Sequence, residues 1–191
     1  DFWPDRKKFE ANDLVVITGE LGTTKKGEPT IWATEVVLAA KALLPAPEKW
    51  HGLQDVEARY RMRYVDLLAN PDVRAAFQLR SRIVTEARTY FDGLDYLEVE
   101  TPILQSIFGG ATARPFATHH NALGMDLFLR IAPELYLKRL LVGGLERVYE
   151  VGRVFRNEGI SSRHNPEFTM LESYEAWADY RDIMERVEGL F

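Results

Sequence analysis

The sequence predicts an α+β fold, in which helices flank a mostly antiparallel sheet and a short β-rich segment precedes them. Three observations support this prediction. The first 44 residues are β-rich. Beyond residue 50, apolar side chains recur at helical spacing over 54–68 and 71–91. Two strand candidates, 147–158 and 167–175, flank a polar loop that is long enough to fold the second strand back against the first.

The β-rich segment 1–44 contains two strand candidates, 14–21 and 30–38, separated by a turn that includes Gly27 and Pro29. Two strands with one turn cannot bury an apolar face on their own. We therefore expect this segment to be the end of a small barrel.

The region 45–70 begins with a proline-containing linker and ends with the helix 54–68. The helix 71–91 follows, and Asn70 with Pro71 provides its start signal. The remaining elements of the predicted 71–191 unit are strands at 96–100 and 127–131 and helices at 134–142 and 180–191.

Composition excludes several classes of protein. Of the 191 residues, 46% are hydrophobic, which is too many for a disordered chain. With 24 Lys+Arg against 29 Asp+Glu, a general basic coat for nucleic acid is excluded, although a local RNA surface stays open. No apolar run is long enough for a membrane helix. The absence of Cys fits a reducing compartment, so we expect a cytoplasmic location.

The chain does not begin with Met, and it stops at Phe191 inside a helical pattern. We therefore expect it to be a piece of a longer protein.

Alternation along the two C-terminal strands gathers charged and aromatic side chains. If both segments are extended, Arg156 and Glu158 share a face, and Phe168, Glu172 and Tyr174 share a face of the partner strand. Charges on a buried sheet face need a compensating partner. A site for a zwitterionic and anionic ligand would explain them, and so would a solvated outer face with ordinary ion pairs.

The same residues carry a resemblance to a known family. Phe155–Glu158, followed by Arg163–Glu172, resembles motif 2 of class II aminoacyl-tRNA synthetases, in the form found in lysyl-tRNA synthetase. The resemblance extends from Trp50 onward, and its most specific further segments are 109–116, 118–123 and 129–140. It implies the antiparallel sheet of that class, preceded by part of an OB-fold barrel.

The resemblance implies ATP-dependent activation of L-lysine to lysyl-adenylate, followed by transfer to tRNA(Lys). Arg156 matches the catalytic arginine that bridges the amino-acid carboxylate and the α-phosphate. ATP would also be held by Glu158, His164, Asn165 and Phe168, with the Phe168 ring against the adenine.

The substrate lysine needs an anionic partner for each of its two ammonium groups. Glu134, with the backbone of Gly110, matches the family's site for the α-ammonium. Glu172 and Tyr174 match the pair that holds the ε-ammonium, and Arg156 holds the carboxylate.

Further implications concern the rest of the molecule. The segment 1–44 would end an anticodon-binding OB-fold, motif 1 (about 73–102) would form a homodimer interface, and motif 2 would span about 147–175. No motif 3 is present, and the resemblance places the Mg²⁺ ligands beyond residue 191, so we expect no metal ligands in this chain and no activity from it alone. Asp95 and Phe108 depart from the family pattern, where Gly and Pro are usual.

Two alternatives share this fold. One is a paralogue that lysylates a protein such as an elongation factor and lacks the anticodon barrel. The other is a catalytically dead module for tRNA binding or interaction. Specificity for aspartate or asparagine is disfavoured, because Glu172 and Tyr174 suit a cation. The adjacent His119 and His120 do not suggest a metal site, because neighbouring residues on a strand face opposite ways.

Overall fold

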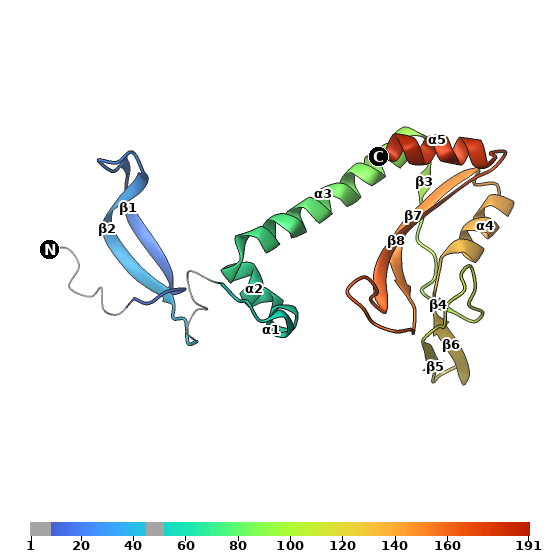
Figure 1. Ribbon diagram of the computed structural model, residues 1–191, viewed down its shortest axis with the longest axis horizontal. Helices are drawn as coiled ribbons and strands as arrows, with labels where there is room; N and C mark the ends of the chain where they lie inside the picture. Colours follow the sequence, from blue (N-terminus) through green and yellow to red (C-terminus); the bar gives the residue numbers. More distant parts are fainter. Residues whose placement is uncertain (1–8, 45–51) are drawn as a thin grey trace. The chain divides into compact units, whose positions relative to one another are not determined.

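The computed structural model describes residues 9–44 and 52–191, with the elements arranged along the chain as in Figure 1. The chain divides into two compact units, Asp1–Leu79 and Arg80–Phe191. The prolines of the predicted linker lie outside the described residues. Within the described part, no helix has both the length and the apolar character needed to cross a membrane.

The first unit contains an antiparallel hairpin of β1 (Leu14–Thr23) and β2 (Pro29–Ala40), as the alternation predicted. Gly27 has a positive φ of 86° and allows the chain to reverse between the strands. Large apolar side chains of the hairpin are exposed, among them Leu21 at 88% and Trp32 at 61%. Within the described residues the hairpin therefore forms no closed apolar core.

The predicted helix 54–68 is two helices, α1 (Val56–Arg61) and α2 (Arg63–Ala69). Met62 separates them with φ −115° and ψ 56°. The break brings arginines from both helices to the fully buried carboxylate of Asp66, which accepts hydrogen bonds from Arg59, Arg63 and Asn70. Periodicity alone does not reveal such a break, because the apolar spacing continues across it.

The long helix α3 (Pro71–Gly93) crosses the boundary between the units and leads into two sheets. The first sheet has the order β3-β7-β8, from Leu97–Glu98, Arg147–Phe155 and Glu167–Glu175; β3 is parallel to β7, and β8 is antiparallel to it. The second sheet is antiparallel, with the order β4-β6-β5, from Leu104–Gln105, Met125–Leu129 and Ala117–His120. The predicted class of helices with mostly antiparallel sheets is confirmed.

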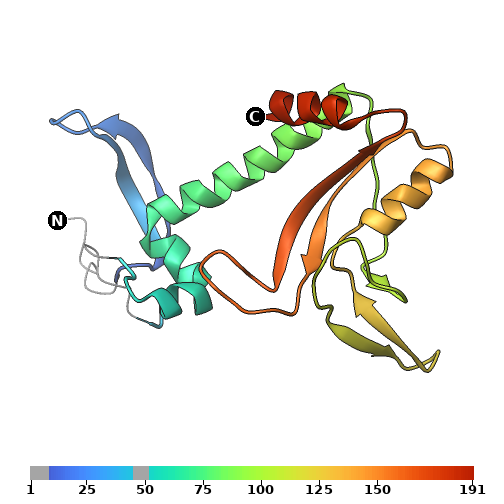
Figure 2. The same cartoon turned by 45° about the vertical axis from the view of Figure 1, so that its right-hand side comes forward.

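Two helices complete the second unit (Figures 1 and 2). Helix α4 (Glu134–Val142) packs against β7 and β8, and helix α5 (Tyr180–Leu190) lies beside the end of α3. The Tyr90 hydroxyl donates a hydrogen bond of 2.8 Å to the Arg186 carbonyl and so ties α5 to α3. The helix that precedes β7 and the helix that follows β8 are therefore both held by contacts with other elements.

The core of the second unit is aromatic. Phe91 stacks on Tyr149 at 5.1 Å and meets Tyr96 edge-on at 5.1 Å between ring centroids. The Tyr149 hydroxyl donates to Asp92 at 2.8 Å. Between α3 and β3 the chain turns at Asp95, whose φ of 61° is left-handed; Asp tolerates this conformation better than most residues do. The departure from Gly at this position is therefore compatible with the turn.

Truncation of Phe91 tests this core. We expect Phe91→Ala to lower the free energy of unfolding by about 3–5 kcal/mol, because the cavity removes contacts with two rings. Urea denaturation followed by circular dichroism measures the change. The control is Val142→Ala, at a position that is 91% exposed, which should change the free energy by less than about 0.5 kcal/mol. Equal effects of the two substitutions would contradict the assigned core.

Candidate active site on the β7–β8 hairpin

The register of β7 and β8 decides which side chains share a face. Glu150 pairs with Glu172, Gly152 with Met170 and Val154 with Phe168. Directly opposed residues of an antiparallel pair point to the same side of the sheet. One face therefore carries Phe168, Glu172 and, two residues further, Tyr174, which the alternation predicted for β8.

Arg156 joins this face from just beyond the end of β7. Its backbone N–H donates to the Pro166 carbonyl at 2.8 Å, and its Nε donates to the Ile131 carbonyl at 3.4 Å. The guanidinium lies 5.2 Å from the centroid of the Phe168 ring. Arg156 and Phe168 are therefore on the same side of the hairpin, which is the arrangement that the sequence predicted.

Glu172 and Tyr174 form a half-buried acidic pair. The Tyr174 hydroxyl donates a hydrogen bond of 3.3 Å to Glu172 Oε2. Burial raises the pKa of Glu172 above its usual 4.5, and the charge of Glu134 adds to this rise, whereas the Tyr174 hydroxyl and the charge of Arg156 oppose it. Burial and the carboxylates of Glu172 and Glu134 also raise the pKa of Tyr174, so its hydroxyl stays protonated at neutral pH.

Glu134 starts helix α4 and faces a glycine loop. A Cβ on Gly110 would lie 2.7 Å from the Cβ of Glu134, so only glycine fits there, and its φ of 87° also favours glycine. Lys138 Nζ lies 2.6 Å from Glu134 Oε1 and 5.9 Å from the centroid of the Tyr174 ring. An ammonium group is thus already held between the α4 carboxylate and the β8 tyrosine.

Phe108 occupies the other departure from the family pattern. Its ring packs edge-on against Phe128, with the centroids 4.9 Å apart and the planes at 66°. This contact anchors the loop that leads to Gly110 on the second sheet. The left-handed conformation of Gly110 is kept with Phe at position 108.

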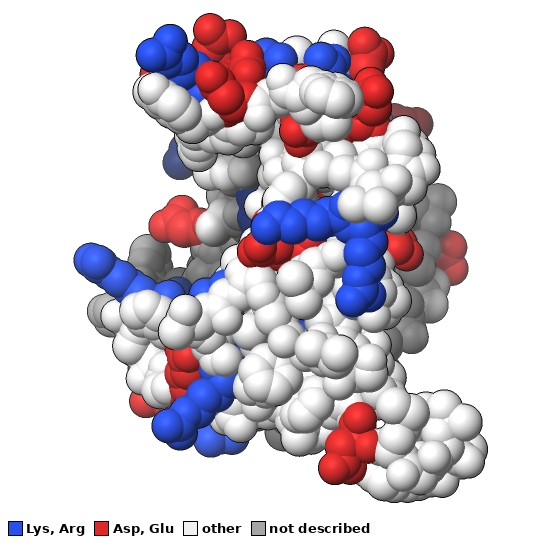
Figure 3. Space-filling view, turned by 90° about the vertical axis from the view of Figure 1, so that its right-hand side faces the viewer, with Lys and Arg blue, Asp and Glu red and all other residues white. Residues whose placement is uncertain are grey.

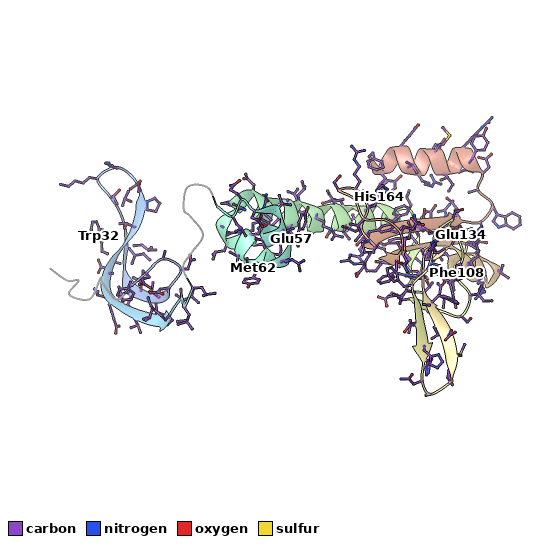
Figure 4. All side chains as sticks on the ribbon, turned by 60° about the horizontal axis from the view of Figure 1, so that its bottom comes forward. Trp32, Glu57, Met62, Phe108, Glu134 and His164 are labelled. Carbon is purple, nitrogen blue, oxygen red and sulfur yellow. The ribbon has the colours of Figure 1, made fainter. Side chains whose placement is uncertain are left out.

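Glu158, His164 and Asn165 lie on the loop that follows Arg156 and precedes Phe168. All three are exposed on the loop between β7 and β8, and Figure 4 marks His164 there, apart from Glu134 on α4. The predicted strand 147–158 is shorter in the structure, where β7 ends at Phe155, so Glu158 lies beyond the strand. Pro166 accepts from the Arg156 N–H but has no N–H to return a second hydrogen bond.

The loop is nevertheless ordered by its own hydrogen bonds. Ser161 Oγ lies 2.8 Å from His164 Nδ1, and the two residues form an isolated β-bridge. The hydroxyl of Ser161 also accepts from the Arg163 N–H at 3.2 Å. Of the two ring nitrogens of His164, Nδ1 contacts Ser161 and Nε2 does not.

Sequence reasoning missed the most deeply buried charges on this face, Arg130 and Glu150, which are 2% and 3% exposed. Alternation along the strand could have indicated Glu150, because it lies an even number of residues before Arg156. In the structure it is directly opposite Glu172. Arg130 follows an apolar strand, and its acceptors are distant in sequence, so no local pattern marks it.

The described residues contain no group of three or more metal-ligating side chains. His119 Nδ1 lies 2.8 Å from Asp126 Oδ1, and His120 accepts a hydrogen bond from the Leu123 N–H. Figure 3, which shows the molecule from the right-hand side of Figure 1, has Lys and Arg side chains near acidic ones among many uncharged residues, so the surface in this view does not have a single sign of charge.

The arrangement is suited to a ligand with two cationic ends and a negative charge. Glu134 and Glu172 offer two carboxylates, and Arg156 offers a planar fork for a carboxylate or a phosphate. Phe168 adds a flat apolar surface. A dibasic amino acid and a nucleotide would each find complementary groups here.

Comparison with known proteins identifies the family. The pattern that defines the tRNA synthetases of class II (D, K and N) matches residues 55–191, and the chain belongs to this family. A lysine–tRNA ligase of Carboxydothermus hydrogenoformans is 61% identical over 184 residues, which cover 96% of this chain and 38% of that protein. The resemblance to the lysyl-tRNA synthetase form of class II is confirmed.

Other relatives carry the same name. Lysine–tRNA ligases of Syntrophomonas wolfei and Roseiflexus sp. are 61% and 56% identical, over 96% and 100% of this chain and over 37% and 40% of their own lengths. The chain thus spans about two fifths of the length of these relatives.

The raised pKa of Glu172 predicts a stability change on neutralisation. A carboxyl whose folded pKa is raised opposes folding when it is ionised, and the opposition disappears as pH falls through that pKa towards 4.5. We expect Glu172→Gln to increase the free energy of unfolding at pH 7 and to have a smaller effect when the pH is lowered to 4.5.

Urea denaturation of both proteins at the two pH values measures this dependence. Glu158→Gln, at an exposed loop position, is the matched control and should show neither effect. A loss of stability in Glu172→Gln that grows with pH would contradict the assigned burial.

Proposed function

We propose that the protein containing this chain is a lysine–tRNA ligase. It would join L-lysine to ATP as lysyl-adenylate and then transfer the lysyl group to tRNA(Lys). The observation that carries this proposal is the convergence of Glu134, Glu172 and Tyr174 near Arg156 on one face of the β7–β8 hairpin. The names of the relatives support it.

The first step needs no side-chain nucleophile. A carboxylate oxygen of lysine attacks the α-phosphorus of ATP, a new P–O bond forms, and the bond to pyrophosphate breaks, with pyrophosphate leaving. Both reacting groups are anions, so catalysis consists of positioning and charge neutralisation. Arg156 would bridge the two with its guanidinium, which is fixed by the Ile131 carbonyl and the Phe168 ring.

Lysine would bind across two carboxylates. Glu134, beside the backbone of Gly110, would accept the α-ammonium, and Glu172 with the Tyr174 hydroxyl would accept the ε-ammonium. The position of the Lys138 ammonium supports this assignment, because it already lies between Glu134 and the Tyr174 ring. Lys138 would move aside when the substrate ammonium arrives.

ATP would stack its adenine against Phe168 and contact the loop residues Glu158, His164 and Asn165. Because these three side chains are exposed, the loop would close over the nucleotide. Because Nδ1 of His164 contacts Ser161 Oγ, Nε2 is the ring nitrogen that would reach a phosphate oxygen.

The remaining assignments follow the family. We propose that 1–44 is the last part of an OB-fold that binds the tRNA anticodon, that 45–70 connects it, and that 71–191 begins the catalytic domain. The β1–β2 hairpin favours a tRNA ligase over a paralogue without the anticodon barrel. Motif 1, about 73–102, would pair two subunits. Mg²⁺ would accompany ATP on carboxylates beyond residue 191. The cytoplasm is the expected location.

Lysine-dependent exchange of pyrophosphate into ATP tests the proposed function. We expect exchange by the full-length protein that contains these residues and none by residues 1–191 alone. The full-length protein should also charge tRNA(Lys). Absence of exchange in both proteins would refute the enzyme and favour a binding module.

The roles assigned to the two ends of the site predict different kinetic effects. In the full-length protein, Glu172→Gln should raise the KM for lysine by about 10- to 150-fold, because a charge-assisted contact worth roughly 1.5–3 kcal/mol is lost, and should leave the KM for ATP nearly unchanged. Glu167→Gln, at an exposed position of the same strand, is the control. Equal losses of lysine and ATP binding would mean that the lysine pocket is misassigned.

Phe168 provides the complementary prediction. Phe168→Leu should raise the KM for ATP by a factor that corresponds to about 1–3 kcal/mol of lost stacking and should spare the KM for lysine. Steady-state exchange kinetics with each substrate varied in turn measures both constants. An unchanged KM for ATP would contradict the stacking role.

A further inference from the structure

Arg130 is a buried charge that the reaction does not use directly. It follows β6 and is 2% exposed, and every acceptor within its reach belongs to another segment. Its Nε donates to the Arg153 carbonyl at 2.8 Å, and its Nη1 donates to the Thr101 carbonyl at 3.2 Å and to Thr101 Oγ1 at 3.1 Å. Nη1 also forms an ion pair with Glu150.

Glu150 and Thr101 complete this cluster. Glu150 is 3% exposed and accepts a second hydrogen bond, of 2.6 Å, from the Thr101 hydroxyl. The two charges therefore compensate each other, and the described residues contain no buried side-chain polar atom without a partner. Only a planar guanidinium can reach the Arg153 carbonyl, Thr101 and Glu150 together, so a lysine cannot replace Arg130.

The strand leaves a space for the guanidinium at Gly152. A Cβ at this position would clash with Nη2 of Arg130. Gly152 therefore lets the arginine lie flat against the face of β7 between Glu150 and Val154. This is the face that carries Phe168 and Glu172 on the partner strand.

The backbone of Arg130 joins the same elements. Its N–H donates to the Ile103 carbonyl at 2.9 Å, and its carbonyl accepts from the Phe155 N–H at 2.9 Å. Phe155 is the residue before Arg156, and four residues after Arg130 the helix with Glu134 begins. Arg130 is thus located where the segment carrying Glu134 meets the strand leading to Arg156.

The charge of Arg130 also reaches Glu172. Burial raises the pKa of this carboxyl, as does the charge of Glu134, whereas the Tyr174 hydroxyl and the charges of Arg156 and Arg130 act in the opposite direction. The electrostatic contribution agrees with the location of the arginine on the same face of the sheet as Glu172.

A buried ion pair is seldom retained for stability alone, because well-packed apolar residues of similar volume often stabilise a protein as much or more. Here the pair connects three segments: the one that contains Thr101, the one that leads from Arg130 to Glu134, and strand β7. The site needs these segments at a fixed spacing. We propose that Arg130 is a positioning residue that sets the separation of Glu134 and Glu172, and thereby selects the chain length of the dibasic substrate. This inference rests on the proposed function.

The test uses the full-length enzyme and compares L-lysine with L-ornithine, which is one methylene shorter, in the pyrophosphate-exchange assay. Arg130→Met removes the fork, and Arg130→Lys keeps a charge without the fork. Thr101→Val removes the threonine hydroxyl contacts without changing a charge, and it serves if the Arg130 variants do not fold. The control is Arg153→Met. Arg153 lies on β7, and its side chain is half-exposed on the face of the sheet opposite to Glu150 and Gly152.

One missing methylene is worth roughly 10–200-fold in a well-fitted pocket. We expect Arg130→Met and Arg130→Lys to lower the ratio of kcat/KM for lysine over ornithine by about tenfold or more, with the KM for ATP changed less than about threefold. Thr101→Val should shift the ratio in the same direction by a smaller factor, and Arg153→Met should not shift it.

An unchanged lysine-to-ornithine ratio in folded Arg130→Met or Thr101→Val would overturn the proposal, whatever the loss of stability. Full recovery of the ratio in Arg130→Lys would also overturn it, because charge rather than fork geometry would then be sufficient. Wild-type enzyme without lysine-dependent exchange refutes the proposed function instead, so the two failures are distinguishable.

Discussion

The site depends on the in-register antiparallel pairing of β7 with β8. The pairing sets Glu150 opposite Glu172 and Val154 opposite Phe168, so that charged and aromatic side chains project from one face. A slip by a single residue would move the whole set on one strand to the other face. Every role assigned to β8 therefore rests on this register.

Several features fix that register. Phe91 and Tyr149 stack beneath the opposite face, and the Glu175 carboxylate at the end of β8 accepts a hydrogen bond of 2.7 Å from the Tyr96 hydroxyl. At the other end, Phe155 pairs with Glu167, and Pro166 accepts from the Arg156 N–H but has no N–H to extend the pairing further. Aromatic packing on one side thus holds a polar, functional surface on the other.

The polar face is balanced by compensation rather than by exposure to solvent. Arg130 is paired with Glu150, Glu134 with Lys138, and Tyr174 with Glu172. Burial still leaves Glu172 with a raised pKa, so an incoming cation would stabilise the ionised form of this carboxylate. The site therefore favours a ligand that carries an ammonium group.

Much of the site was predictable from sequence, because β8 and α4 follow regular patterns. The bounds 167–175 and 134–142 agree with the structure, and the alternation within β8 correctly grouped Phe168 with Glu172. The predicted end of the first strand at residue 158 was wrong, because β7 ends at Phe155 and the loop residue Pro166 has no N–H with which to extend the pairing. Arg130 was not predictable, since its partners come from segments that only the fold brings together.

The most direct measurement is a crystal structure of the full-length protein with a non-hydrolysable lysyl-adenylate analogue. We expect the α-ammonium about 3 Å from a Glu134 oxygen, the ε-ammonium about 3 Å from Glu172, and the Arg156 guanidinium on the bridging phosphate. An analogue bound on the opposite face of the β7–β8 hairpin, or with its ε-ammonium away from Glu172, would contradict this expectation.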